Sequence, residues 1–193
     1  MRSHLRLWPV TIVCSVVCSA IALSAHVTPP RILMTELEAL QRLFPGAGEP
    51  PAQQIRLTSE SRQQIYKQFD WKPDAKYRVF PVGAGGGSGA LFVLIDYTLH
   101  GPVRTAVAID RQGRVKGAQI LELQEEAYVW VKPIIDADFA KPWIGRDCQR
   151  GTKPPASAGQ GGENMIRFYR AIIEGQLCHA AALYRFGMQG GRT

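Results

Sequence analysis

The pattern of hydrophobic and polar positions first predicts two short helices. Leucines at helical spacing follow Thr35, which forms a capping box with Glu38, so a helix is expected to run to Leu43. A second helix is predicted over Ser59–Phe69, where apolar residues four positions apart share one face. The stretch Gly46–Gln54 between them is rich in proline and glycine and is expected to be a loop.

The middle of the chain changes to the alternating and β-branched pattern that is typical of strands. A glycine at the end of the segment Asp110–Gly113 favours a tight hairpin turn, and His100–Pro102 marks another turn. The last three predicted strands are adjacent in sequence, which indicates an antiparallel meander. The predicted strands are Tyr77–Val82, Ala90–Leu99, Val103–Ile109 and Val115–Leu123.

Helical periodicity returns in the last third of the chain. A short helix is expected around Ile134–Phe139, a loop over Cys148–Gly161, and a long amphipathic helix from Gly162 to about Phe186. The order of helices, then strands, then a helix predicts an α+β fold in which helices pack a small antiparallel sheet.

The N-terminus has the pattern of a targeting segment. Arg2 and Arg6 precede an apolar run, Leu7–Leu23, and small residues follow it. Residues 1–25 are therefore interpreted as a cleaved signal peptide or a retained membrane anchor, and residues 26–193 as a single domain. Cys14 and Cys18 each follow a valine, which argues against lipidation. Either interpretation places the protein in the periplasm or outside the cell, with membrane association through this segment as an open alternative.

The charge pattern limits the class of partner. The formal net charge is +7, and the basic residues are scattered along the chain. This is compatible with anionic ligands or lipid headgroups. Nucleic acid is not expected as a partner, because no basic stripe with interleaved aromatic residues is present.

The cysteines suggest a cross-link. An exported chain meets an oxidising compartment, so Cys148 and Cys178 are expected to pair as a disulfide, which would stabilise the fold by roughly 3–4 kcal/mol. The alternative is two unpaired thiols, with one buried on the last helix. The sequence has neither a CxxC motif nor an HxxxH pair.

Two glycine-rich stretches resemble phosphate-binding loops to different degrees. GAGGGSGA, which begins at Gly83, formally matches a dinucleotide fingerprint but opens a strand, so it is interpreted as a solvent loop. AGQGGEN lacks the Lys-Ser/Thr ending of a P-loop but leads into the last helix, whose first-turn N–H groups favour anions. Glu163 and Asn164 there suit either helix capping or an anion site, although the Glu163 carboxylate would repel a phosphate.

Other candidate residues have weaker support. Glu122, Glu125 and Glu126 are interpreted as a solvated charge cluster rather than a catalytic acid pair. His26, His100 and His179 have no nucleophile at a suggestive spacing. Tyr128, Trp130 and Trp143 are expected to pack in the core, with stacking on an aromatic ligand as the alternative.

The order of motifs resembles a known family. The stretch GALFVLIDYTLHGPVRTAVAIDRQGRVKGAQILELQEEAY, together with TELEALQRLFPGA before it and PWIGRD after it, is similar to the FMN-binding domain of exported electron-transport proteins. These include flavin-carrying subunits of the Rnf complex and of the sodium-pumping NADH:quinone oxidoreductase, and stand-alone relatives. The resemblance implies a flavin cofactor and a redox protein or membrane electron-transport complex as partner.

One departure from the family concerns the attachment of the flavin. The family carries a Ser-Gly-Ala-Thr motif before its last helix, and the threonine takes FMN through a phosphoester bond. Here the region reads SAGQGGENM, so Glu163 or Asn164 stands in place of that threonine, and neither offers a hydroxyl. The resemblance therefore implies non-covalent FMN, or a domain that has lost it.

Two functions follow from this resemblance. In the first, the protein transfers electrons through FMN, with the phosphate at Gly161, Gly162 and Asn164 and the carboxylate of Glu125 near the flavin edge. In the second, it is a flavin-free accessory or interaction subunit of a periplasmic or membrane redox complex.

Overall fold

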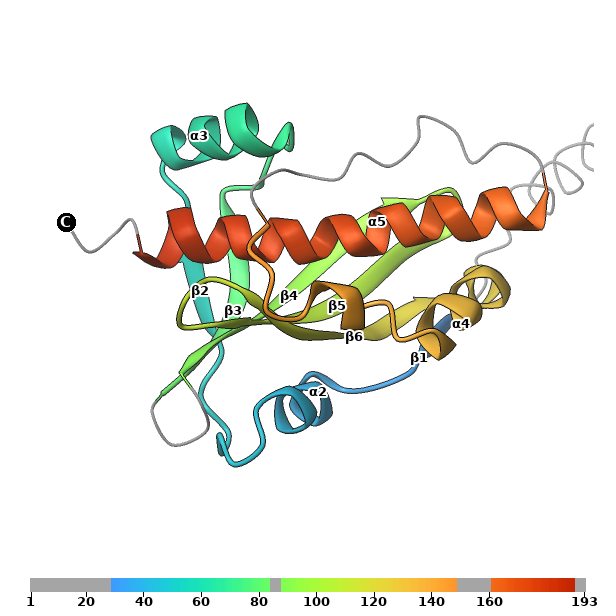
Figure 1. Ribbon diagram of the computed structural model, residues 1–193, viewed down its shortest axis with the longest axis horizontal. Helices are drawn as coiled ribbons and strands as arrows, with labels where there is room; N and C mark the ends of the chain where they lie inside the picture. The colour runs from blue at the N-terminus through green and yellow to red at the C-terminus, as the bar shows by residue number, and fades with distance from the viewer. Residues whose placement is uncertain (1–28, 84–87, 149–160, 190–193) are drawn as a thin grey trace, which may run out of the picture.

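A six-stranded antiparallel sheet forms the centre of the computed structural model, which describes residues 29–83, 88–148 and 161–189 (Figure 1). The strand order across the sheet is β1-β6-β5-β4-β3-β2, so the predicted meander of β4, β5 and β6 is its middle. The strands are β1 (Pro30–Ile32), β2 (Gln53–Arg56), β3 (Lys76–Val82), β4 (Gly89–Thr98), β5 (Gly101–Asp110) and β6 (Val115–Gln124).

Helices cover both faces of the sheet. Figure 1 shows α2 on one side of the sheet and the long α5 on the other, with α3 lying beyond α5. The part of the chain described here contains α2 (Glu36–Leu43), α3 (Ser59–Phe69), α4 (Tyr128–Asp136) and α5 (Gly162–Leu183). Shorter helical segments are η2 (Glu125–Ala127), η3 (Lys141–Trp143) and the π-helical η4 (Tyr184–Gln189). The fold is α+β, as the sequence predicts.

Alternation along β4 divides the core into two layers. Phe92 and Leu94 face α5 and join the larger core, which also takes in buried residues of α3 and α4. Leu91 and Val93 point to the opposite face and pack in a smaller core with Leu40 of α2. A central strand that is buried on both faces explains why the segment reads as a continuous apolar run.

Local sequence signals explain several element boundaries. The Thr35 side chain accepts a hydrogen bond from the backbone N–H of Glu38 while the Glu38 carboxylate accepts from the backbone N–H of Thr35, which confirms the capping box. Gly113 has a φ of 81° in the β5–β6 turn, where an L side chain is disfavoured. At Gly89, an added Cβ would lie 2.2 Å from the carbonyl oxygen of Ile109, so β4 and β5 approach closely there.

Two strands and one helix differ from the sequence-based expectation. Gln53 and Gln54, at the end of the expected loop, enter β2 and pair with β3, and β1 forms despite its proline. Both are edge strands, which tolerate polar residues and proline. The helix expected over Ile134–Phe139 is instead α4, which begins at Tyr128 and contains Pro133.

Candidate functional site

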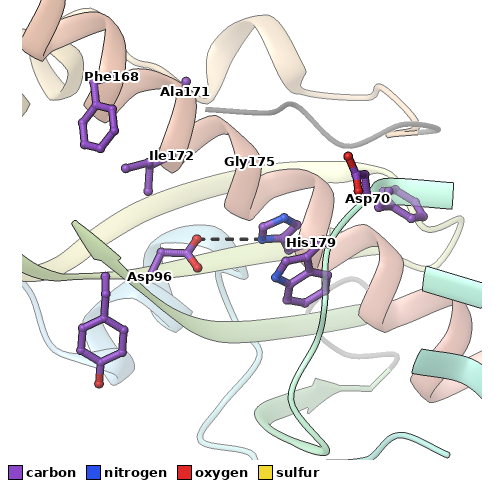
Figure 2. A pocket seen from close by; sticks show the side chains of 10 residues that line it. Asp70, Asp96, Phe168, Ala171, Ile172, Gly175 and His179 are labelled. Atoms are coloured by element: carbon purple, nitrogen blue, oxygen red, sulfur yellow. Dashed lines mark ion pairs between the residues drawn. The ribbon is translucent and has the colours of Figure 1, made fainter. Parts of the chain in front are cut away.

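An open pocket lies where the end of α3, the last residues of β4 and the middle of α5 meet (Figure 2). Its volume is about 290 Å³, and most of its lining is apolar or aromatic. This volume is at the lower end of the range for small-molecule sites, so the pocket suits one ring system or part of a larger ligand. The lining residues are Phe69, Asp70, Trp71, Asp96, Tyr97, Phe168, Ala171, Ile172, Gly175 and His179.

Helical spacing places half of this lining on one stripe of α5. The lining residues of α5 recur every three or four positions and therefore face the same side of the helix; they are Phe168, Ala171, Ile172, Gly175 and His179. Figure 2 shows them following the helix above β4. The same stripe continues one turn toward the N-terminus to Asn164. The pocket and the first turn of α5 consequently share one face of the helix.

Asp96 is the carboxylate that β4 presents to this pocket. It follows Phe92 and Leu94 on the α5 face, and its side chain is 31% exposed. Burial raises the pKa of Asp96 to about 6, while a hydrogen bond from Gln176 acts in the opposite direction. Gln176 is itself buried, and its Nε2 donates to the carbonyl oxygen of Val103 at 3.2 Å.

His179 forms the second polar wall of the pocket. Its ring stacks on Trp71 with centroids 3.9 Å apart and an interplanar angle of 8°. Its Nδ1 lies 3.9 Å from Oδ2 of Asp96, the contact drawn in Figure 2. Burial lowers the pKa of His179 to about 3, so at neutral pH the imidazole is uncharged and this contact is not an ion pair.

Replacing Asp96 by asparagine is expected to stabilise the fold in a pH-dependent way. The pKa of Asp96 in the folded protein lies above its usual value of 3.8. The contribution of Asp96 to the free energy of unfolding is therefore complete below pH 3.8 and is lost as pH rises through about 6. At about pH 8, Asp96→Asn should raise the free energy of unfolding by about 1–2 kcal/mol, a figure discounted for partial exposure. At about pH 4, the difference should nearly vanish.

Urea unfolding of the wild type and of Asp96→Asn at both pH values measures this effect. Asp74→Asn is a matched control, because Asp74 is an exposed carboxylate just before β3. An Asp96→Asn variant that is less stable than the wild type at the higher pH would contradict the burial argument.

A second polar cluster joins α5 to the β4–β5 hairpin. The Tyr169 hydroxyl lies 2.9 Å from His100 Nδ1 and 3.2 Å from Thr98 Oγ1. The Trp130 ring of α4 stacks parallel to Tyr169 and contacts the ring of His100 at 4.7 Å between centroids. Trp130 thus has the packing role expected from the sequence, and His100 gains a hydrogen-bond partner that its position in the chain does not indicate.

The residues predicted to bind a phosphate occupy the start of α5. Gly161 is its N-cap with a φ of 96° and no side-chain cap, and Gly161, Gly162 and Glu163 are exposed. The amide oxygen of Asn164 accepts a hydrogen bond from Arg167. The residues of the loop before Gly161 lie outside the described part of the chain, as do Ala84–Gly87 of the first glycine stretch, His26 and the targeting segment.

Glu125 has a structural partner. Its Oε1 accepts from Nη1 of Arg31 at 2.8 Å, and the Arg31 guanidinium lies over the Tyr128 ring. Glu122 likewise pairs with Arg104, which also bonds Glu36 of α2. Glu125 therefore links η2 to β1, and Glu122 links β6 to β5 through Arg104, so the two do not form a joint acidic site, and neither lines the pocket.

Cys148 and Cys178 are brought together, although they are distant in sequence. Both are buried, and both are free thiols in this structure, so the disulfide stays a prediction. A hydrogen bond with the Cys148 thiol, together with burial, raises the pKa of Cys178. Among residues 29–83, 88–148 and 161–189, no cluster of three or more histidine, cysteine or acidic side chains could hold a metal ion.

Comparisons of the chain with family models, with curated proteins and with solved structures each found no match. Within the described ranges, no helix has the length and hydrophobicity needed to cross a membrane.

The pocket residues Trp71 and Asp96 are not among the site residues that the sequence predicts. Asp96 does carry a signal, because it is the one charged residue in the apolar strand ALFVLIDYTL. Trp71 carries none, since only the fold brings it against His179.

Proposed function

We propose that the protein is an FMN-binding-domain-like electron-transfer protein that holds its flavin non-covalently, with the ring system in the pocket lined by Trp71 and α5. The observation that supports this most is the stripe on α5 that joins an aromatic pocket to a glycine-capped helix N-terminus. When bound, the flavin supplies the electron chemistry, and the protein positions it.

The two ends of the site fit the two ends of FMN. Aromatic walls such as Phe168 and Trp71 suit a planar ring, and the first-turn backbone N–H groups at Gly162 and Glu163 suit a phosphate. Six residues of helix separate Gly162 from Phe168, about 9 Å along the axis, which an extended ribityl chain can bridge. The pocket volume favours the ring alone, so the phosphate lies outside it along α5.

Asp96 and His179 give the ring end its polarity. At neutral pH the carboxylate accepts hydrogen bonds, and the uncharged imidazole can donate or accept one. The imide edge of a flavin offers both an N–H donor and carbonyl acceptors. Asp96 therefore takes the role near the ring that the sequence suggests for Glu125, because Glu125 is paired with Arg31.

Titration of FMN with the purified protein tests the proposal. Saturable quenching of flavin fluorescence is expected, and Trp71→Ala should weaken binding about tenfold by removing one stacking wall. Tyr66→Ala is the matched control, because Tyr66 is an exposed aromatic residue of α3 that does not line the pocket. Riboflavin, which lacks the phosphate, should bind more weakly than FMN.

The alternative is a flavin-free accessory domain of a periplasmic or membrane redox complex. The exposed Glu163 in the first turn of α5 favours it, because its carboxylate occupies the helix end that a phosphate would need. A protein that neither quenches FMN nor discriminates it from riboflavin would support this function and contradict the first.

A further inference from the structure

Four of the eight large apolar side chains exposed in the described residues lie at one end of the sheet. Ile95 and Tyr97 of β4 and Leu99 directly after it occupy alternate positions and are 52%, 81% and 67% exposed. Ile32 of β1 is 71% exposed. We refer to these four residues as the hairpin-end patch.

Strand register shows that the strand residues of the patch share one face, and Leu99 lies in the turn directly after β4. Ile32 is in register with Glu122 of β6, Glu122 with Arg104 of β5, and Arg104 with Ile95 of β4. Because directly paired residues point to the same side of a sheet, Ile32 and Ile95 share one face, about 14 Å apart across three strand spacings. It is the α2 face, since Ile95 continues the alternation of Leu91 and Val93. This face is buried near α2 and exposed toward the hairpin.

The chain enters the sheet at this same end. The carbonyl oxygen of Pro29 accepts a hydrogen bond from the backbone N–H of Glu125, directly after β6, and β1 begins at Pro30. The apolar run Leu7–Leu23 ends six residues before Pro29. Six residues span at most about 20 Å when fully extended. A bilayer that holds this run therefore lies within reach of the hairpin end.

The chemistry of the patch suits a lipid interface. Tyr97 combines an apolar ring with a polar hydroxyl, as residues at the headgroup level do, and Leu99 and Ile95 offer aliphatic surface. The neighbouring charges are paired with each other: Arg104 bonds both Glu122 and Glu36, and Arg31 bonds Glu125. Contact here consequently depends on apolar burial and does not require anionic lipid.

We propose that the hairpin-end patch rests on the surface of the membrane in which the run Leu7–Leu23 is retained. A single apolar segment tethers the domain but leaves it free to rotate, and the patch is the second contact that fixes its orientation. Tyr97 also borders the pocket, so the edge of the pocket at the end of β4 lies near the bilayer, while Asp96 and α5 lie on the opposite face of the sheet. This inference is independent of whether the pocket binds FMN.

The test uses the full chain in phosphatidylcholine vesicles. Cys14→Ser and Cys18→Ser remove the thiols of the apolar run, and Leu99→Cys receives a polarity-sensitive fluorophore. Cys148 and Cys178 are buried, so we expect the fluorophore to react with residue 99 alone in the folded protein. Gln112→Cys is the matched control, because it is exposed in the β5–β6 turn at the opposite end of the sheet, about 30 Å away along β5.

The label at residue 99 is expected to shift its emission to the blue and to be quenched by brominated lipid, while the label at residue 112 behaves as in water. Salt should leave the difference unchanged. Water-like emission at residue 99, or equal quenching at both positions, would overturn the proposal. The proposal also requires that mass spectrometry finds the run Leu7–Leu23 in the chain purified from cell membranes. A chain that has lost this run would overturn the proposal as well.

Discussion

Oxidation of the purified protein is expected to join Cys148 to Cys178 and to raise the free energy of unfolding by about 3–4 kcal/mol. The two thiols are buried side by side, with a hydrogen bond between them, although thirty positions separate them in sequence. Closing a loop of that length removes conformational entropy from the unfolded chain, while the folded chain already holds both thiols together. The bond would tie the segment after η3 to the C-terminal part of α5.

Glutathione at defined ratios of oxidised to reduced form measures this bond. The two thiols lose two protons and two electrons to the oxidised glutathione, so the protein mass falls by two hydrogens and two glutathiones appear in reduced form. The urea midpoint should rise on oxidation in the wild type and stay constant in Cys148→Ser. Thiols of residues 148 and 178 that remain open to alkylation after oxidation and unfolding would refute the prediction.

Slow formation of the bond is part of the same expectation. The thiolate is the reactive form of a cysteine, and the raised pKa of Cys178 keeps its thiol protonated. Local opening of the segment near Cys148 must therefore precede exchange. A disulfide that forms more slowly than in a short model peptide would agree with this burial.

The central fold follows from local signals in the sequence. The capping box at Thr35, the apolar periodicity of α3 and the turn at Gly113 each act within a few residues, so the sequence predicts these elements closely. The edge strands β1 and β2 depend on pairing with β6 and β3, and their own residues are mostly polar or proline. Helix rules treat an internal proline as a boundary, which explains why the sequence predicts a helix only after Pro133, whereas α4 begins at Tyr128.

The pocket can be predicted only in part, because its walls come from distant segments. Trp71 follows α3, Asp96 lies near the end of β4 and His179 lies late in α5, and no periodicity connects them. The sequence shows that Asp96 is a charged residue in an apolar strand, but it does not indicate that His179 lies beside it. The glycine loop before α5 is also visible, because helix-capping signals are local, whereas the stripe that leads from it to the pocket depends on how the helix lies on the sheet.

Removing the side chain of Tyr169 is expected to destabilise the fold by about 3–5 kcal/mol. Tyr169 is fully buried, is the largest side chain in that condition among the described residues, and connects α5 with Trp130 of α4. Tyr169→Ala leaves a cavity in this layer. Tyr169→Phe keeps the ring and removes the hydroxyl that bonds His100 and Thr98, so it should cost only about 1–2 kcal/mol.

The difference between the two variants separates packing from hydrogen bonding. Urea unfolding of both, with Tyr66→Phe as an exposed control, gives the two costs directly. A double-mutant cycle with His100→Ala then isolates the coupling between the imidazole and the hydroxyl. Equal losses for Tyr169→Phe and Tyr169→Ala would contradict the packing role. Tyr169 does not line the pocket, so we expect Tyr169→Phe to bind FMN with the affinity of the wild type. A loss of affinity in this variant would instead indicate that the hairpin at Thr98 and His100 holds Asp96 in place.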